Sequence, residues 1–277
     1  MLKTALIQLN SGDTPSENLP VTQDFIAEAA GDGAQFVLTP EVTNCVSASR
    51  AHQLEVLQTE AEDQTLAALR AQADALGIWL LIGSLALKTD DPDGRFANRS
   101  FLIGPDGGIV ARYDKMHMFD VTVSQKETYR ESKGYRPGET AVIAEVEGAK
   151  IGLSICYDIR FPYLYRALAQ SGAQVLTAPS AFSTATGPAH WEPLLKARAI
   201  ETGSFVLAPA QTGLHAATTG KARETYGHSL AISPWGEILC DGGKAPGISL
   251  ISLDFSQVQA VRNSIPSLTH TRTFTGP

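Results

Sequence analysis

Three side chains in the sequence have the chemistry needed to cleave an acyl bond together: a carboxylate, an ammonium and a thiol. Glu41, Lys115 and Cys156 each follow an apolar, strand-like run. A thiol becomes a good nucleophile once a base takes its proton, and a carboxylate can be that base. A cation placed beside the reacting carbonyl stabilises the oxyanion. The sequence therefore holds the parts of a covalent hydrolase.

Cys156 lies between the apolar run Lys150–Ile155 and Pro162, a residue suited to the first turn of a helix. At such a strand-to-helix corner, the positive end of the helix dipole favours a thiolate. A free thiol is only about 3% ionised at pH 7, so a nearby base matters. Position alone is equally typical of a buried structural cysteine.

The other candidates also have ordinary explanations when each is taken alone. Glu41 follows Pro40 at a strand end, where a carboxylate is commonly solvated. Lys115 lies among Met and Phe side chains, which is unusual for an unpaired ammonium, although its stem could snorkel to solvent. Glu131 is a surface charge or a partner for Lys115. It belongs to the polar stretch Asp114–Thr140, whose length favours an active-site wall.

Two further patterns in the sequence give only weak evidence for a functional site. The four histidines that would allow a Cys–His protease lack a Cys-Gly-Ser-Cys-Trp-like signature around Cys156; they are His117, His190, His215 and His228. Asp90–Gly94 resembles the start of a calcium loop but has no Glu at the twelfth position, so we interpret it as a turn. The three cysteines show neither metal nor disulfide spacing. We therefore expect no metal.

The chain has 277 residues, of which 43% are hydrophobic and 18% charged, as in an ordinary soluble globular protein. The 22 basic and 29 acidic residues give a formal charge of −7 without any basic block. This argues against nucleic acid or an anionic membrane surface as a partner. No run approaches the ~20 apolar residues of a membrane span, and the first apolar run is too short for a signal peptide. We expect a cytoplasmic protein.

Apolar β-branched runs alternate with helical patterns, which predicts an α/β fold. The first half contains expected strands at 4–8, 36–39 and 78–85, helices at 17–30 and 62–76, and a hairpin of 100–103 with 109–113. The second half contains expected strands at 150–155, 174–178 and 204–208, helices at 162–170 and 190–202, and a hairpin of 227–233 with 237–240. Since no Pro/Ser/Gly linker separates the halves, we expect a single domain over residues 1–277, with two packed sheets and helices outside.

In this order, Glu41, Lys115 and Cys156 resemble the triad of the nitrilase or carbon–nitrogen hydrolase superfamily. The resemblance spans nearly the whole chain and is carried by the segments Leu38–Glu41, Tyr113–Phe119 and Gly152–Pro162. It implies a four-layer αββα sandwich that dimerises or forms a higher homo-oligomer. It also implies cofactor-free hydrolysis of a small amide, with Glu131 as a second acid that orders Lys115.

The expected mechanism is hydrolysis of a non-peptide C–N bond through a thioester. Glu41 takes the proton of Cys156, and Lys115 with the backbone N–H of Tyr157 stabilises the oxyanion. A small acidic substrate needs a cation for its far carboxylate. Arg160 is the candidate for that cation, with a structural salt bridge to Asp158 as the alternative.

Within the superfamily, four segments resemble the Nit branch: Pro179–Phe182, Thr186–Glu192, Ala197–Thr202 and Ser233–Gly236. We expect Phe182 and His190, which lie in two of them, to contact substrate together with Arg160. Two other segments resemble deaminated glutathione amidases more than ω-amidases; they are Ala210–His215 and Tyr226–Ser229.

Deaminated glutathione is therefore the expected substrate. The alternatives are an ω-amidase that acts on α-ketoglutaramate and a catalytically silent binding protein on the same fold, although no triad member is missing. One departure is Tyr163, since these relatives usually carry Glu after the Phe-Pro pair. The hydrogen bonding behind the nucleophile is expected to differ accordingly.

Overall fold

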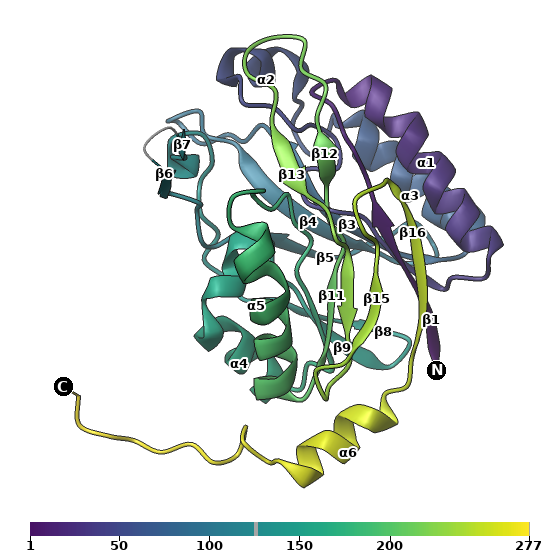
Figure 1. The fold of residues 1–277 in the computed structure, drawn as a ribbon. Helices are drawn as coiled ribbons and strands as arrows, with labels where there is room; N and C mark the ends of the chain where they lie inside the picture. The colour runs from purple at the N-terminus through teal and green to yellow at the C-terminus, as the bar shows by residue number, and fades with distance from the viewer. Residues whose placement is uncertain (125–126, 277) are drawn as a thin grey trace.

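A computed structural model of the chain describes residues 1–124 and 127–276, and two positions of the expected Asp114–Thr140 stretch, 125 and 126, lie outside the described residues. Two six-stranded sheets lie face to face, with helices on the two outer sides (Figure 1). This confirms the predicted four-layer αββα arrangement. Among the described residues, no helix is long and apolar enough to cross a membrane.

The first sheet has the strand order β16-β1-β2-β3-β4-β5. Its strands are β1 (Leu2–Gln8), β2 (Phe36–Leu38), β3 (Trp79–Leu87), β4 (Ala97–Ile103), β5 (Ile109–Asp114) and β16 (Gly247–Leu253). Strands β1, β2 and β3 run parallel, and the other neighbours pair antiparallel. The outer face is covered by α1 (Pro15–Gly31) and α3 (Gln64–Leu76), as Figure 1 shows.

The second sheet has the order β15-β14-β11-β10-β9-β8. Its strands are β8 (Ile143–Val146), β9 (Ala149–Gly152), β10 (Val175–Thr177), β11 (Phe205–Ala208), β14 (Leu230–Ile232) and β15 (Ile238–Asp241). Helices α4 (Pro162–Gln170) and α5 (Gly187–Thr202) cover its outer face (Figure 1). The smaller elements are α2 (Arg50–Val56), β6 (Thr122–Ser124), β7 (Glu127–Thr128), β12 (Thr212–Leu214), β13 (Glu224–Tyr226), α6 (Ser256–Ser264) and the 3-10 helices η1 (Glu131–Lys133) and η2 (Cys156–Arg160).

Strand alternation explains why the first sheet carries two apolar faces. Successive side chains of a strand point to opposite sides. Leu80 and Ile82 of β3 pack with residues of α1 and α3, whereas Leu81 between them packs into the layer between the two sheets. Both faces are thus buried, which is why these strands read as continuous apolar runs in the sequence.

The expected strand at 150–155 is only partly correct. Strand β9 ends at Gly152, although the Leu153 N–H still donates to the carbonyl of Val142, the residue before β8, at 3.0 Å. Helix α6 and strand β16 were not predicted. Their sequences mix polar and apolar residues without a clean period, and β16 is recognised only by its antiparallel pairing along the whole of β1.

Gly83 marks an irregularity in β3, where the pairing with β4 shifts between Ile82 and Leu85. A Cβ atom at residue 83 would overlap the carbonyl oxygens of Thr39 and Pro40. The chain after β2 therefore passes directly over this glycine. Only a residue without a side chain allows the segment that carries Glu41 to pack so closely on β3.

We expect Gly83→Ala to lower the free energy of unfolding by at least about 2 kcal/mol, because the added methyl group displaces backbone in a packed layer. Thermal and urea unfolding of the purified variant measure this change. Gly31→Ala is the matched control, since a Cβ there meets no atom within 4 Å. Equal stability of the two variants would contradict the close approach at Gly83.

Candidate active site

Glu41 lies in a turn that follows β2 and crosses the edge of β3. Its neighbour Val42 has a φ of +48°, which is a strained value for a β-branched residue. The turn is held by the Val42 N–H, which donates to Ser84 Oγ at 2.8 Å, and by Gln211 Nε2, which donates to the Glu41 carbonyl at 3.2 Å. This turn aims the Glu41 side chain into the protein, where only 4% of the residue is exposed.

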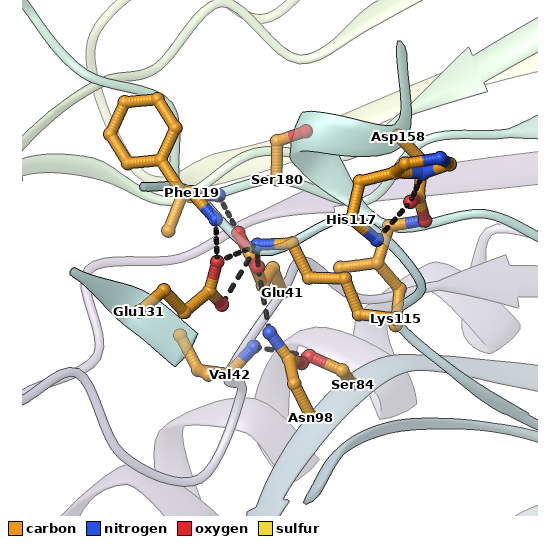
Figure 2. Close-up of polar contacts among 12 residues, drawn as sticks. Glu41, Val42, Ser84, Asn98, Lys115, His117, Phe119, Glu131, Asp158 and Ser180 are labelled. Atoms are coloured by element: carbon orange, nitrogen blue, oxygen red, sulfur yellow. Dashed lines mark hydrogen bonds and ion pairs between the residues drawn. The ribbon is translucent and has the colours of Figure 1, made fainter. Parts of the chain in front are cut away.

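The Glu41 carboxylate accepts three hydrogen bonds (Figure 2). Oε1 accepts from Lys115 Nζ at 2.9 Å and from Asn98 Nδ2 at 2.8 Å. Oε2 accepts from the backbone N–H of Ala181 at 2.8 Å. Asn98 lies in β4, Lys115 follows β5 and Ala181 follows β10, so the carboxylate is fixed by elements far apart in the sequence.

Lys115 follows β5 directly and is 2% exposed. Its Nζ lies 2.9 Å from Glu41 Oε1 and 2.9 Å from both carboxylate oxygens of Glu131 (Figure 2). Glu131 is held in turn by the backbone N–H of Phe119, which donates to Oε2 at 2.6 Å. The structure thus places Glu131, from the long polar stretch, beside the lysine that the sequence suggested as its partner.

Cys156 begins the 3-10 helix η2 and has a φ of +48°. Its N–H donates to the Pro179 carbonyl at 3.0 Å, and its thiol is close enough to the Glu41 carboxylate for that charge to act on it. The expected helix N-terminus is not at this residue, because α4 begins only at Pro162. The base next to the thiol is therefore the local feature that can activate it.

The resting charges of the three groups follow from their contacts. Burial raises the pKa of the Cys156 thiol, and the Glu41 carboxylate raises it further, so the thiol stays protonated. Burial alone would raise the pKa of Glu41, but the Lys115 ammonium and the hydrogen bonds outweigh it and lower that pKa. Burial would lower the pKa of Lys115, but Glu131 and Glu41 raise it well above its usual value. The resting site is thus carboxylate, ammonium and thiol.

A second group of predicted residues gathers on the other side of the nucleophile. Arg160 Nη2 lies 3.1 Å from His190 Nδ1, and its guanidinium lies 5.8 Å from the ring centroids of both Tyr157 and Phe182. The alternative salt bridge with Asp158 is not formed, and Arg160 has no ion pair among the described residues. A half-buried cation without a carboxylate partner can bind an anionic group.

Sequence reasoning missed Asn98 and the backbone N–H of Ala181 as ligands of the Glu41 carboxylate. Asn98 is 57 residues from Glu41, and no local pattern identifies it. Ala181 was quoted only as part of a similar segment, and a backbone donor leaves no trace in residue type. In residues 1–124 and 127–276, no group of three or more His, Cys, Asp or Glu side chains could hold a metal ion.

Comparisons with known sequences identify similar proteins. The family model described as carbon–nitrogen hydrolase matches residues 3–263. A deaminated glutathione amidase from Yersinia enterocolitica is 36% identical over 271 residues, which are 97% of this chain and 92% of that protein. One from Synechocystis is 38% identical over 268 residues, with 96% of each chain covered.

Solved structures agree with this likeness. Saccharomyces cerevisiae Nit3, a member of branch 10 of the nitrilase superfamily, has a TM-score of 0.85 and 28% identity, over 99% of this chain and 97% of that one. A mutant amidase from Nesterenkonia sp. AN1, solved with acrylamide added to its active-site cysteine, has a TM-score of 0.77 and 26% identity, over 96% and 98% of the two chains. The chain belongs to the carbon–nitrogen hydrolase family, the nitrilase superfamily, and is an amidase that acts on C–N bonds other than peptide bonds.

Proposed function

We propose that residues 1–277 form one carbon–nitrogen hydrolase domain that cleaves a small linear amide through a thioester on Cys156. The observation that carries this proposal is the contact of one buried carboxylate, Glu41, with both the Cys156 thiol and the Lys115 ammonium. A base, a nucleophile and a cation that share one carboxylate suit nucleophilic acyl transfer.

The reaction starts when Glu41 takes the thiol proton as the Cys156 sulfur attacks the amide carbon. The resulting oxyanion is stabilised by Lys115 Nζ and the backbone N–H of Tyr157. The C–N bond breaks as Glu41 returns the proton to the leaving nitrogen, which departs as ammonia or an amine. Glu41 then takes a proton from water, the hydroxide attacks the thioester, and the acid and the free thiol are released.

Glu131 acts in this proposal as a positioning residue for the lysine. With Glu41 it confines the ammonium from two sides, so that the third direction of Nζ is left for the substrate oxygen. The two carboxylates also keep Lys115 charged in a buried place where a lone ammonium would lose its proton.

The proposed substrate is deaminated glutathione, the compound in the names of the similar amidases from Yersinia and Synechocystis. Arg160, without a carboxylate partner among the described residues, supports an acidic substrate, and Phe182 and His190 border it. We keep ω-amidase action on α-ketoglutaramate as the second candidate, because that compound is also an amide with a distant carboxylate.

The same proposal includes a homodimer or higher homo-oligomer in the cytoplasm, without nucleic acid or a membrane surface as partner. Several large apolar side chains at the surface support an association of copies, among them Ile200, Trp235 and Ile265. The formal charge of −7 supports the absence of nucleic acid and of an anionic membrane surface as partners.

Release of the amine from deaminated glutathione and of ammonia from α-ketoglutaramate, compared as kcat/KM, tests the substrate. We expect the former to be preferred. Preference for the latter would make the enzyme an ω-amidase with the same site. Cys156→Ala is the blank, and we expect it to fold normally without turnover. Persistent turnover in that variant would identify another nucleophile, and a folded wild type inert on all amides would favour the silent binding protein.

Arg160→Leu should raise KM for the keto-acid amide by about 10- to 100-fold, because a charge-assisted hydrogen bond is lost. KM for a neutral amide such as propionamide should stay within about twofold. Steady-state kinetics measure both values. Arg70→Leu is the charge-matched control, since Arg70 lies on α3 and contacts only the carbonyl of Gly107. Equal effects of Arg160→Leu on both amides would exclude the carboxylate role.

Lys115→Met removes one oxyanion donor and should lower kcat at least about 10²-fold. It also leaves Glu41 and Glu131 without their counter-charge, so circular dichroism must confirm that the variant is folded. Single-turnover kinetics with the preferred amide measure the loss. Near-normal turnover in a folded variant would remove Lys115 from the mechanism.

A further inference from the structure

Asp158 is a fully buried carboxylate that the mechanism does not use. It lies two residues after Cys156 in η2, and 0% of the residue is exposed. A buried carboxylate without partners would be strongly unfavourable, so the donors that satisfy it show what it is for.

Two donors reach Asp158 Oδ2, and two reach Oδ1. Oδ2 accepts from the backbone N–H of Ile155 at 2.9 Å and from the Tyr113 hydroxyl at 2.7 Å. Oδ1 accepts from the backbone N–H of His117 at 3.0 Å and lies 2.6 Å from His117 Nδ1. All four contacts are within ordinary hydrogen-bond distance, and they use the capacity of both oxygens.

The positions of these donors in the sequence are the important point. Tyr113 and His117 stand two residues before and two residues after Lys115, whereas Ile155 directly precedes Cys156. One carboxylate therefore binds the backbone turn of the nucleophile and both sides of the segment that carries the lysine. Figure 2 shows Asp158 and His117 beside the Lys115 segment. The segments come from different sheets, so this contact sets their separation at the site.

The His117 ring makes two further contacts. Its ring is stacked on Phe161, with centroids 3.6 Å apart and planes at 9°, and its Nε2 makes a hydrogen bond with the Tyr163 hydroxyl. If the ring has a single proton, on Nδ1, that proton is donated to Asp158 in a hydrogen bond. Nε2 is then an acceptor, and the Tyr163 hydroxyl donates to it. Tyr163 supplies a neutral donor at the position where a carboxylate was expected from the resemblance.

The direct polar neighbours of the imidazole are the Asp158 carboxylate and the Tyr163 hydroxyl. Tyr113 shares Asp158 and stays protonated, since burial and the Asp158 charge raise its pKa. Lys115 is the nearest cation along the chain, and its ammonium is engaged by Glu41 and Glu131.

We propose that Asp158 is a positioning residue that holds the Cys156 turn against the Lys115 segment, and that the His117 ring, with a proton on Nδ1 and oriented by Tyr163, is the donor that completes this contact. The inference rests on the proposed roles of Cys156 and Lys115. It assigns no contact with substrate to Asp158, His117 or Tyr163.

Two reactions of Cys156 separate this role from a general effect on folding. Alkylation by iodoacetamide needs the nucleophile and its base but develops no oxyanion. Amide hydrolysis needs the lysine as well. Loss of the His117 donor leaves the contact between Asp158 and Ile155 in place, so the nucleophile turn stays while the lysine segment loosens. Hydrolysis should therefore suffer, and alkylation should not.

The variant pair is His117→Leu and His117→Asn, because the Asn amide nitrogen can replace Nδ1 as the donor to Asp158. Asp158→Asn is less useful, since it would turn an NH2 group toward two of the four donors. We expect His117→Leu to lower kcat for deaminated glutathione about ten- to hundredfold, as for a misplacement near 1 Å, with KM and the alkylation rate within about twofold. His117→Asn should recover most of kcat. Mass spectrometry of the Cys156 peptide follows alkylation.

Unchanged kcat in His117→Leu, an equal fall of kcat and alkylation, or no recovery in His117→Asn would overturn the proposal. The ring proton gives a test that needs no turnover: ¹⁵N resonances of the His117 ring should show a proton on Nδ1. A ring that is protonated on Nε2 alone would also overturn the proposal. If the wild type fails to hydrolyse deaminated glutathione, the proposed substrate falls, and the ring-proton and alkylation measurements still decide the role of Asp158.

Discussion

The Lys115 ammonium buried between two carboxylates is the interaction on which the rest of the site depends. Taking three charges out of water is unfavourable unless each keeps well-placed partners. The chain supplies them from distant places: Asn98 and the Ala181 N–H for Glu41, and the Phe119 N–H for Glu131. The tight turn over Gly83 brings Glu41 to the site, and the long polar stretch after β5 brings Glu131.

This shared ammonium also links the proton of the thiol to the charge of the oxyanion. At rest, Lys115 lowers the pKa of Glu41 while burial raises that of Cys156, so the proton remains on sulfur. In the proposed mechanism, a substrate oxygen that becomes negative beside Nζ competes with Glu41 for the same cation. Glu41 then becomes a stronger base at the moment when the thiol proton must leave. The site needs no preformed thiolate for this chemistry.

The sequence permitted the layer architecture to be predicted, because strand alternation and helical periods are local properties. It did not permit the end of β9 to be predicted, since Leu153 and Ile155 beyond the strand are buried apolar residues like those within it. The order of Glu41, Lys115 and Cys156 and the family resemblance brought the three residues together. Their orientation, which depends on a φ of +48° at both Val42 and Cys156, is a property of the packed fold.

The residues that sequence reasoning missed share one physical reason. Asn98 contacts Glu41 across 57 residues, and Asp158 contacts Tyr113 across 45. A polar residue in an apolar segment indicates that its side chain has a hydrogen-bond partner in the fold. Which residue that partner is depends on which strands become neighbours. The expected thiolate at a helix N-terminus failed for a related reason, because the chain inserts η2 between Cys156 and α4.

Glu41 and Lys115 follow strands of the first sheet, whereas Cys156 follows a strand of the second. Neither half of the chain contains a complete site. During synthesis, the half that emerges first holds base and cation without a sulfur to activate, and the later half holds a thiol without its base. Reactivity is thus created by the docking of the two halves, so a nascent or half-assembled chain has no hydrolytic centre with which to attack cellular amides.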